Sequence, residues 1–188
     1  MRRAVVVPIA VLLAALVATG AFAATHVVSV TNFTFTPATS NIARGDIVRW
    51  NLDSGTHTVV DTSGMDLYGT MFTGTDTYTY SFKAAGVYAY KCGIHSSMTG
   101  KVRVPLTVTK TSATVANVRW ATMDAAEGYV YDVQVRVPGD SWMFFKNGVT
   151  APRANFSAPS GERDFRARLR RVGMGSSKWS LVVDATFG

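Results

Sequence analysis

Residues 77–104 carry the clearest information about the fold, and they read TYTYSFKAAGVYAYKCGIHSSMTGKVRV. Aromatic or aliphatic side chains alternate with small or polar ones over 77–82, 86–90 and 101–104, which predicts three short β-strands. Tyr78, Tyr80 and Phe82 then share one face of the first strand, because side-chain direction alternates along a strand. The segment 84–86 predicts a turn, and Cys92, His95 and Met98 fall in one loop between the second and third strands.

The same short alternating runs extend in both directions along the chain. Upstream they cover 27–30, 47–50 and 57–60, and downstream they cover 114–120, 129–137 and 165–170. No segment after residue 24 has apolar residues at helical spacing over the length of a helix. In the last run Arg166, Arg168 and Arg170 share one face, and Phe165, Ala167 and Leu169 share the other, which predicts a solvated side and a core side. We therefore predict an all-β chain built from two-sheet sandwiches.

The first residues predict export. The chain starts Met-Arg-Arg, continues with an apolar stretch from Ala4 to Ala18 and reaches Ala21-Phe22-Ala23, a small-x-small cleavage pattern. We predict that residues 1–23 are a secretory signal peptide and that the protein is secreted or periplasmic. The alternative is that the apolar stretch stays attached as a membrane anchor.

The length of the remainder allows two small domains, and a second set of alternating runs begins near Pro105. We predict domains at 24–104 and 105–188, packed end to end with restricted motion, because almost no Gly-, Ser- or Pro-rich linker separates them. The first carries six basic and five acidic residues, and the second carries eleven and seven. The excess of basic residues in the second half favours an acidic or cell-surface partner. The alternative is that this charge only keeps the protein soluble. No nucleic-acid recognition motif is present.

Cys92, His95 and Met98 form a Cys-x-x-His-x-x-Met pattern, and His57 lies upstream in a strand context. Two imidazoles and one thiolate with a weak axial thioether are the ligands of blue-copper centres. The spacing alone also allows chance, a buried structural thiol, or zinc, although zinc sites favour four strong ligands and Met is a poor one. A single cysteine in an exported chain has no internal disulfide partner, so a metal gives it a role.

Residues 24–104 resemble the plastocyanin/azurin family of cupredoxins, in the branch whose loops run Cys-x-x-His-x-x-Met. The matching segments are 32–37, 45–53, 57–59, 80–82, 86–92 and 95–100. The resemblance implies a Greek-key β-sandwich with one type 1 copper per chain held by His57, Cys92, His95 and Met98, and it implies that His95 passes electrons to redox partner proteins. Ser96 departs from the Pro common at that position.

Residues 105–188 resemble a fibronectin type III domain. Trp120 falls on the expected second strand, Tyr129 and Tyr131 on the third, and 165–170 with 175–180 match the sixth strand and its Gly-x-Ser-x-Trp-Ser close. The resemblance implies a second β-sandwich that serves as a docking module or a spacer.

These features predict an exported electron carrier rather than an enzyme, since the chain has only three histidines and no nucleophile–base set. Copper capture or delivery, and an adhesion or scaffold role with structural or regulatory copper, remain alternatives. A further hypothesis is that cleavage before Ala24 makes Ala24-Thr25-His26 a square-planar copper or nickel site.

Overall fold

The computed structural model describes residues 23–31, 33–73 and 75–188. The predicted signal peptide therefore lies outside the described residues apart from Ala23. All regular elements in the described ranges are strands, which confirms the all-β prediction. Across these same ranges we find no helix long and apolar enough to span a bilayer.

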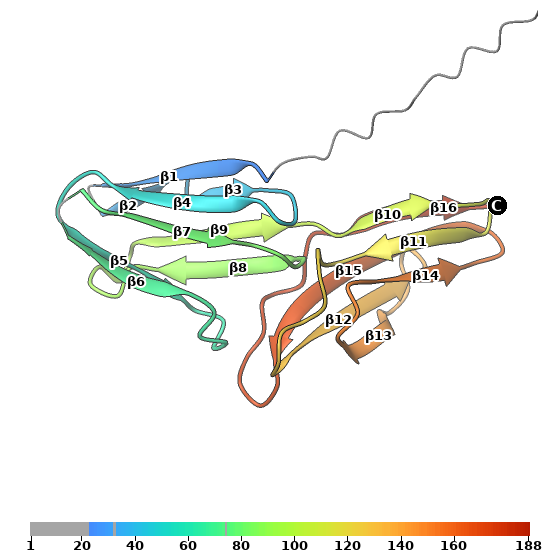
Figure 1. The fold of residues 1–188 in the computed structure, drawn as a ribbon. Coiled ribbons are helices and arrows are strands. Elements are labelled where there is room, and N and C mark those ends of the chain that lie inside the picture. The colour runs from blue at the N-terminus through green and yellow to red at the C-terminus, as the bar shows by residue number, and fades with distance from the viewer. Residues whose placement is uncertain (1–22, 32, 74) are drawn as a thin grey trace, which may run out of the picture.

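The strands up to Val104 form a sandwich of two sheets (Figure 1). The first sheet has the order β2-β1-β4-β7 and the second the order β3-β9-β8-β5-β6. Successive strands cross repeatedly between the sheets, and the pairs β1–β4 and β3–β9 are parallel while the other pairs are antiparallel. The strands of this half are β1 (Thr25–Thr31), β2 (Thr34–Thr36), β3 (Thr39–Asn41), β4 (Ile47–Leu52), β5 (Thr56–Asp61), β6 (Gly69–Thr73), β7 (Thr77–Ser81), β8 (Gly86–Lys91) and β9 (Thr99–Val104).

Alternation along β4 explains why these strands pair in this register. Val48, Trp50 and Leu52 are buried between the sheets, whereas Arg49 on the opposite face is exposed. The Trp50 ring packs edge-on against Tyr90 of β8 at 5.3 Å between ring centroids, and thereby joins the two sheets. A one-residue slip would turn this aromatic core toward water, so the apolar pattern fixes the register.

The strands from Thr107 form a second pair of sheets, which lies end to end with the first pair (Figure 1). The sheet orders are β10-β11-β14 and β13-β12-β15-β16, and all pairs are antiparallel. The strands are β10 (Thr107–Lys110), β11 (Val115–Arg119), β12 (Tyr129–Arg136), β13 (Met143–Val149), β14 (Arg153–Ser157), β15 (Gly161–Arg171) and β16 (Val183–Phe187). Trp120, expected on the second strand of this half, lies one residue beyond the end of β11, where its indole N–H donates to the carbonyl of Ala151 at 2.8 Å.

The two faces of β15 differ from the simple prediction of a core side and a solvated side. Phe165, Ala167 and Leu169 are buried, as predicted. The arginine face, however, is paired with a carboxylate rather than freely solvated. The Nε atoms of Arg168 and Arg170 lie 2.9 and 3.0 Å from one carboxylate oxygen of Asp132, whose side chain is only 1% exposed. Pairing with a buried carboxylate on β12 holds these guanidinium groups against the sheet.

Hydrogen bonds join the two sandwiches at several points. Val87 and Lys178 exchange backbone hydrogen bonds of 2.9 and 3.0 Å, and the Ala85 N–H donates to the Trp120 carbonyl at 2.7 Å. The Arg171 side chain donates to the Met65 carbonyl at 2.9 Å. The strands β8 and β15 and the loop after β5 thus all contribute to the junction.

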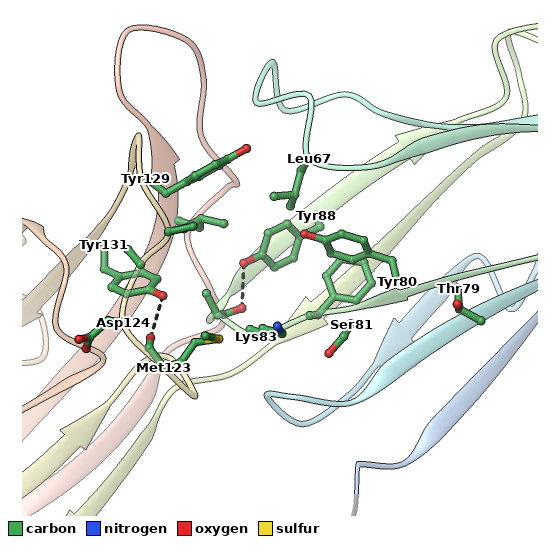
Figure 2. Close-up of a pocket in the computed structure, with 15 residues that line it drawn as sticks. Leu67, Thr79, Tyr80, Ser81, Lys83, Tyr88, Met123, Asp124, Tyr129 and Tyr131 are labelled. Atoms are coloured by element: carbon green, nitrogen blue, oxygen red, sulfur yellow. Dashed lines mark hydrogen bonds between the residues drawn. The ribbon is translucent and has the colours of Figure 1, made fainter.

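A cavity of about 560 Å³ lies at this junction (Figure 2). Tyr80 and Tyr88 line it from the first sandwich, and Tyr129 and Tyr131 line it from the second. The hydroxyl of Tyr88 donates to the Ala84 carbonyl at 2.8 Å, and that of Tyr131 donates to the Met123 carbonyl at 3.0 Å. These bonds satisfy two of the four phenol groups within their own sandwich, and most of the remaining exposed wall is apolar.

The junction gives a first testable prediction. A methyl group added at Gly175 would overlap the carbonyl oxygen of Ser63 and lie 2.8 Å from the carbonyl carbon of Gly64. Because these contacts are backbone atoms that cannot rotate away, Gly175→Ala is expected to lower the free energy of unfolding by about 1–3 kcal/mol. Chemical denaturation monitored by circular dichroism measures this change. Met174→Ala in the same turn removes an exposed side chain and should change stability by less than about 0.5 kcal/mol; equal effects of the two variants would contradict the proposed clash.

Candidate metal centre

Three strands of one sheet position the four predicted ligands. His57 is the second residue of β5, Cys92 directly follows β8, and Met98 directly precedes β9. Lys91 pairs with Thr99 across β8 and β9, so the ladder closes the loop 92–98 at its base. Within the loop, the Cys92 N–H donates to the Met98 carbonyl at 2.9 Å and the Met98 N–H donates to the His95 carbonyl at 3.0 Å. The fold therefore holds the loop before any ion binds.

The side chains of His57, Cys92 and His95 converge. The Cys92 sulfur lies 3.9 Å from Nδ1 of His57 and 3.6 Å from Nδ1 of His95, and the two Nδ1 atoms are 3.2 Å apart. These three residues form the one group of His, Cys, Asp or Glu side chains in the described ranges whose ligand atoms cluster closely enough to hold a metal ion.

The size of this triangle suits a bound ion. With metal–nitrogen and metal–sulfur bonds of about 2.0 and 2.3 Å, three ligands around one ion lie roughly 3.3–3.5 Å apart for the nitrogens and roughly 3.5–3.7 Å for nitrogen and sulfur. The observed separations lie within a few tenths of an ångström of these values. Both imidazoles present Nδ1, and the thiol is a free cysteine rather than part of a disulfide.

Hydrogen bonds around the sulfur favour the thiolate. Burial raises the pKa of Cys92, but N–H groups of Thr58, Ile94 and His95 and the hydroxyl of Thr58 outweigh burial and bring this pKa below its ordinary value. The Thr58 N–H lies 3.4 Å from the sulfur, and its hydroxyl lies 3.8 Å away. Since the thiolate is the metal-binding form of cysteine, these hydrogen bonds to the sulfur prepare the site for a cation.

The two histidines differ in exposure. His57 is 4% exposed, and burial together with the neighbouring His95 lowers its pKa, which favours the neutral, metal-binding imidazole. His95 is half-buried at the molecular surface. The exposed Phe33 ring packs against the His95 ring in a T-shaped arrangement at 4.6 Å between centroids, and the neighbouring Ile94 side chain is also exposed. A cavity of about 330 Å³ lined by Phe33, Ile94 and both imidazoles opens here.

Met98, the fourth predicted ligand, is the last residue of this loop and is buried at 1% exposure. The third histidine of the chain does not join the centre. Nε2 of His26 lies 2.8 Å from a carboxylate oxygen of Asp46, and the same carboxylate accepts hydrogen bonds of 3.0 Å from the N–H groups of Ala24 and Ala43. The segment 24–26 is thus tied to the loop before β4.

No family model matches the chain, and no curated protein matches it. Among solved structures, the chain matches a reduced amicyanin variant at 30% identity over 44% of this chain and 81% of that one, with a TM-score of 0.40. The Cu(I) form of another amicyanin variant matches at 30% identity over 46% and 87%, with a TM-score of 0.41. An oxidised variant matches at 32% identity over 48% and 88%, with a TM-score of 0.39.

A little under half of the chain is therefore similar to amicyanin. The convergence of the Cys92 sulfur with the Nδ1 atoms of His57 and His95 is the observation that indicates a metal site.

Two contributors to the centre were missed by sequence reasoning. Thr58 donates twice to the Cys92 sulfur although 34 residues separate them. Phe33 reaches His95 from the turn before β2, with its backbone in the left-handed region at φ 62°. The position of Thr58 beside His57 was visible in the sequence, but its direction toward the sulfur depends on the antiparallel pairing of β5 with β8.

Proposed function

We propose that this protein is an exported electron carrier that binds one type 1 copper ion through His57, Cys92, His95 and Met98. The observation that carries the proposal is the convergence of one thiol and two imidazole nitrogens within a preformed triangle. Thiolate and thioether sulfur suit Cu(I), and imidazole is compatible with both oxidation states. No other His, Cys, Asp or Glu of the described residues completes a four-ligand zinc set around this triangle.

The surroundings of the ligands suit transfer of single electrons. When bound, copper would cycle between Cu(I) and Cu(II), and the chain's part is to keep the ligands fixed while it does so. Strands β5, β8 and β9 and the hydrogen bonds within the loop provide that rigidity. His95, at the surface among the exposed apolar side chains of Phe33 and Ile94, is the residue that we assign as the contact with redox partner proteins.

We further propose that residues 24–104 are a cupredoxin-like domain and that residues 105–188 are a fibronectin type III-like module for docking or spacing. The supporting observation for the second module is its pair of antiparallel sheets with three and four strands. Export through a cleaved segment 1–23 completes the proposal, because the basic start, the apolar stretch and the small-x-small end of this segment follow the order of a secretory signal peptide.

The visible spectrum of the copper-loaded protein tests the copper assignment. We expect one equivalent of Cu(II) to give the strong absorption of a copper–thiolate bond and a reversible one-electron wave in voltammetry. A colourless Cu(II) complex would argue against the electron-carrier proposal. If copper instead passes rapidly to a weak chelator, the protein would fit capture or delivery, which uses the same ligands but needs exchange.

A further inference from the structure

The outer face of the sheet β13-β12-β15-β16 carries a continuous stack of guanidinium and indole groups. Arg136 and Arg166 lie over the ring of Trp142, at 4.4 and 4.1 Å from its centroid. Arg166 and Arg168 lie over the ring of Trp179, at 4.8 and 4.5 Å. The order is therefore Arg136, Trp142, Arg166, Trp179, Arg168, and we call these five residues the Arg–Trp stack.

Each arginine of the stack is oriented through Nε. The Nε of Arg136 donates to Asp164 at 2.8 Å. The Nε of Arg166 donates to Gln134 at 2.9 Å, and the Nε of Arg168 donates to Asp132 at 2.9 Å. A guanidinium group held through Nε keeps its two Nη groups as further donors, in the planar fork that matches a carboxylate. Stacking on indole rings fixes the planes, so the forks are already ordered before a partner arrives.

The carboxylates that contact the stack belong to Asp164 beside Arg136 and Asp132 beside Arg168, and they leave Arg166 between them without one. Asp132 and Asp164 each face arginines of this sheet, and Asp132 serves Arg170 as well as Arg168. Arg166 has an uncharged amide as its side-chain partner. Its pKa is lowered, mainly by burial and also by the neighbouring charges of Arg136 and Arg168. Like charges gathered around a cation without a carboxylate of its own make this a favourable place for an external anion.

We propose that the Arg–Trp stack is a docking surface for an extended acidic peptide segment of a partner protein. Arg166 and Arg168 are two positions apart on one face of β15, so their Cα atoms are about 6.6–6.8 Å apart, the two-residue repeat of a strand. Alternate side chains of an extended peptide repeat at this same distance. Acidic residues at every second position would therefore meet successive guanidinium forks.

The side chains around the stack favour a protein segment over another polyanion. Phe144 of β13 pairs with Gln134, lies 6.4 Å from the Trp179 ring between centroids and is half exposed. Arg, Trp and Phe are among the residues enriched in protein–protein interfaces, and the aromatic rings offer contacts that a purely ionic polymer would not use. The inference does not depend on copper at the metal centre.

Binding of two synthetic peptides with equal charge tests the proposal. One has four Glu-Ser repeats, and the other has four Glu followed by four Ser; both carry blocked ends, and a heparin octasaccharide serves as the anionic polysaccharide. Isothermal titration of residues 24–188 at low salt is expected to show at least fivefold tighter binding of the alternating peptide than of the block peptide. Equal affinity for the two peptides, or binding of the heparin octasaccharide alone, would overturn the proposal.

Substitutions on β15 locate the surface. Arg166→Gln should weaken binding of the alternating peptide about fivefold, whereas Arg163→Gln, which removes the same charge from the opposite face of the strand, should change it less than twofold. Similar losses in both variants would mean that net charge, not the stack, binds the peptide. Arg166→Lys keeps the charge but lacks the fork, and it should weaken binding at least threefold; unchanged affinity in a folded Arg166→Lys protein would overturn the proposal even if Arg166→Gln does not fold.

Discussion

Replacing Cys92 with Ala is expected to abolish the strong visible absorption of the copper-loaded protein and to weaken copper binding by about a hundredfold or more. Loss of a residue that only orients a metal ligand typically weakens binding by about 10- to 100-fold, and loss of the ligand itself should cost at least as much. The Cys92 sulfur is the only atom of the triangle that can supply a copper–thiolate bond, because the other two atoms are imidazole nitrogens. Absorption spectroscopy and a copper titration with a competing chelator measure the two effects.

Met98→Leu is the matched control for this substitution. It removes the other buried sulfur of the loop but leaves the trigonal set of His57, Cys92 and His95 intact. The colour should persist, and the reduction potential should rise because an apolar side chain in place of the axial ligand disfavours the extra charge of Cu(II). Persistent colour in the Cys92→Ala protein, or loss of colour in the Met98→Leu protein, would show that the ligand roles are assigned wrongly.

Asp132→Asn is expected to be the most damaging single substitution in the second sandwich. The Asp132 side chain is 1% exposed, accepts hydrogen bonds from Arg168 and Arg170, and also accepts one of 3.0 Å from the Gly148 N–H. An uncharged amide would leave two arginines without their carboxylate against the sheet, and breaking a buried pair in this way costs about 3–5 kcal/mol. Urea unfolding measures the loss.

Asp164→Asn provides the comparison for Asp132. The Asp164 side chain is 11% exposed and pairs with one arginine, Arg136. Less desolvation and fewer partners should limit its cost to about 1–2 kcal/mol. An Asp132→Asn protein that is no less stable than the Asp164→Asn protein would contradict the central role of Asp132.

The stability of the second sandwich should also depend on pH through Asp132. Burial raises the pKa of Asp132, but hydrogen bonds from Arg170, Gly148 and Arg168 outweigh it and lower this pKa below its ordinary value. The carboxylate therefore contributes its full stability above the pKa of the unfolded chain, about 3.9, and loses it as the pH falls through the lower folded value. Urea midpoints between pH 6 and pH 2 should fall less steeply in the Asp132→Asn protein.

The strands near the metal centre were the easiest part of the fold to predict. Alternation over 86–90 and 101–104 located β8 and β9 within a residue or two, because side chains on opposite faces of a half-buried strand must differ in polarity. The short strands β2 and β3 were not predicted, since three residues such as Thr34–Thr36 carry too little pattern to register. The edge strand β13 was also missed because both of its faces are largely exposed, so its side chains do not alternate in polarity.

The arginine face of β15 shows where a correct pattern led to an incomplete interpretation. Alternation placed Arg166, Arg168 and Arg170 on one face, and we expected water beside them. The structure instead places Asp132, Trp142 and Trp179 against them. Those residues come from β12 and from two connecting loops, and their approach depends on how the sheet is paired rather than on any local signal.

By itself, the sequence determined the all-β character of the chain and the identity of the candidate ligands. Alternation can be read within each short segment, and the chemistry of a ligand belongs to the residue itself. The tertiary structure alone decided that His57 meets Cys92 and His95, that Thr58 donates to the sulfur, and that the two sandwiches enclose a tyrosine-lined cavity. Each of these contacts joins segments that are far apart in the chain. Their positions follow from strand order and register, which are set by the collective burial of the core and not by any single segment.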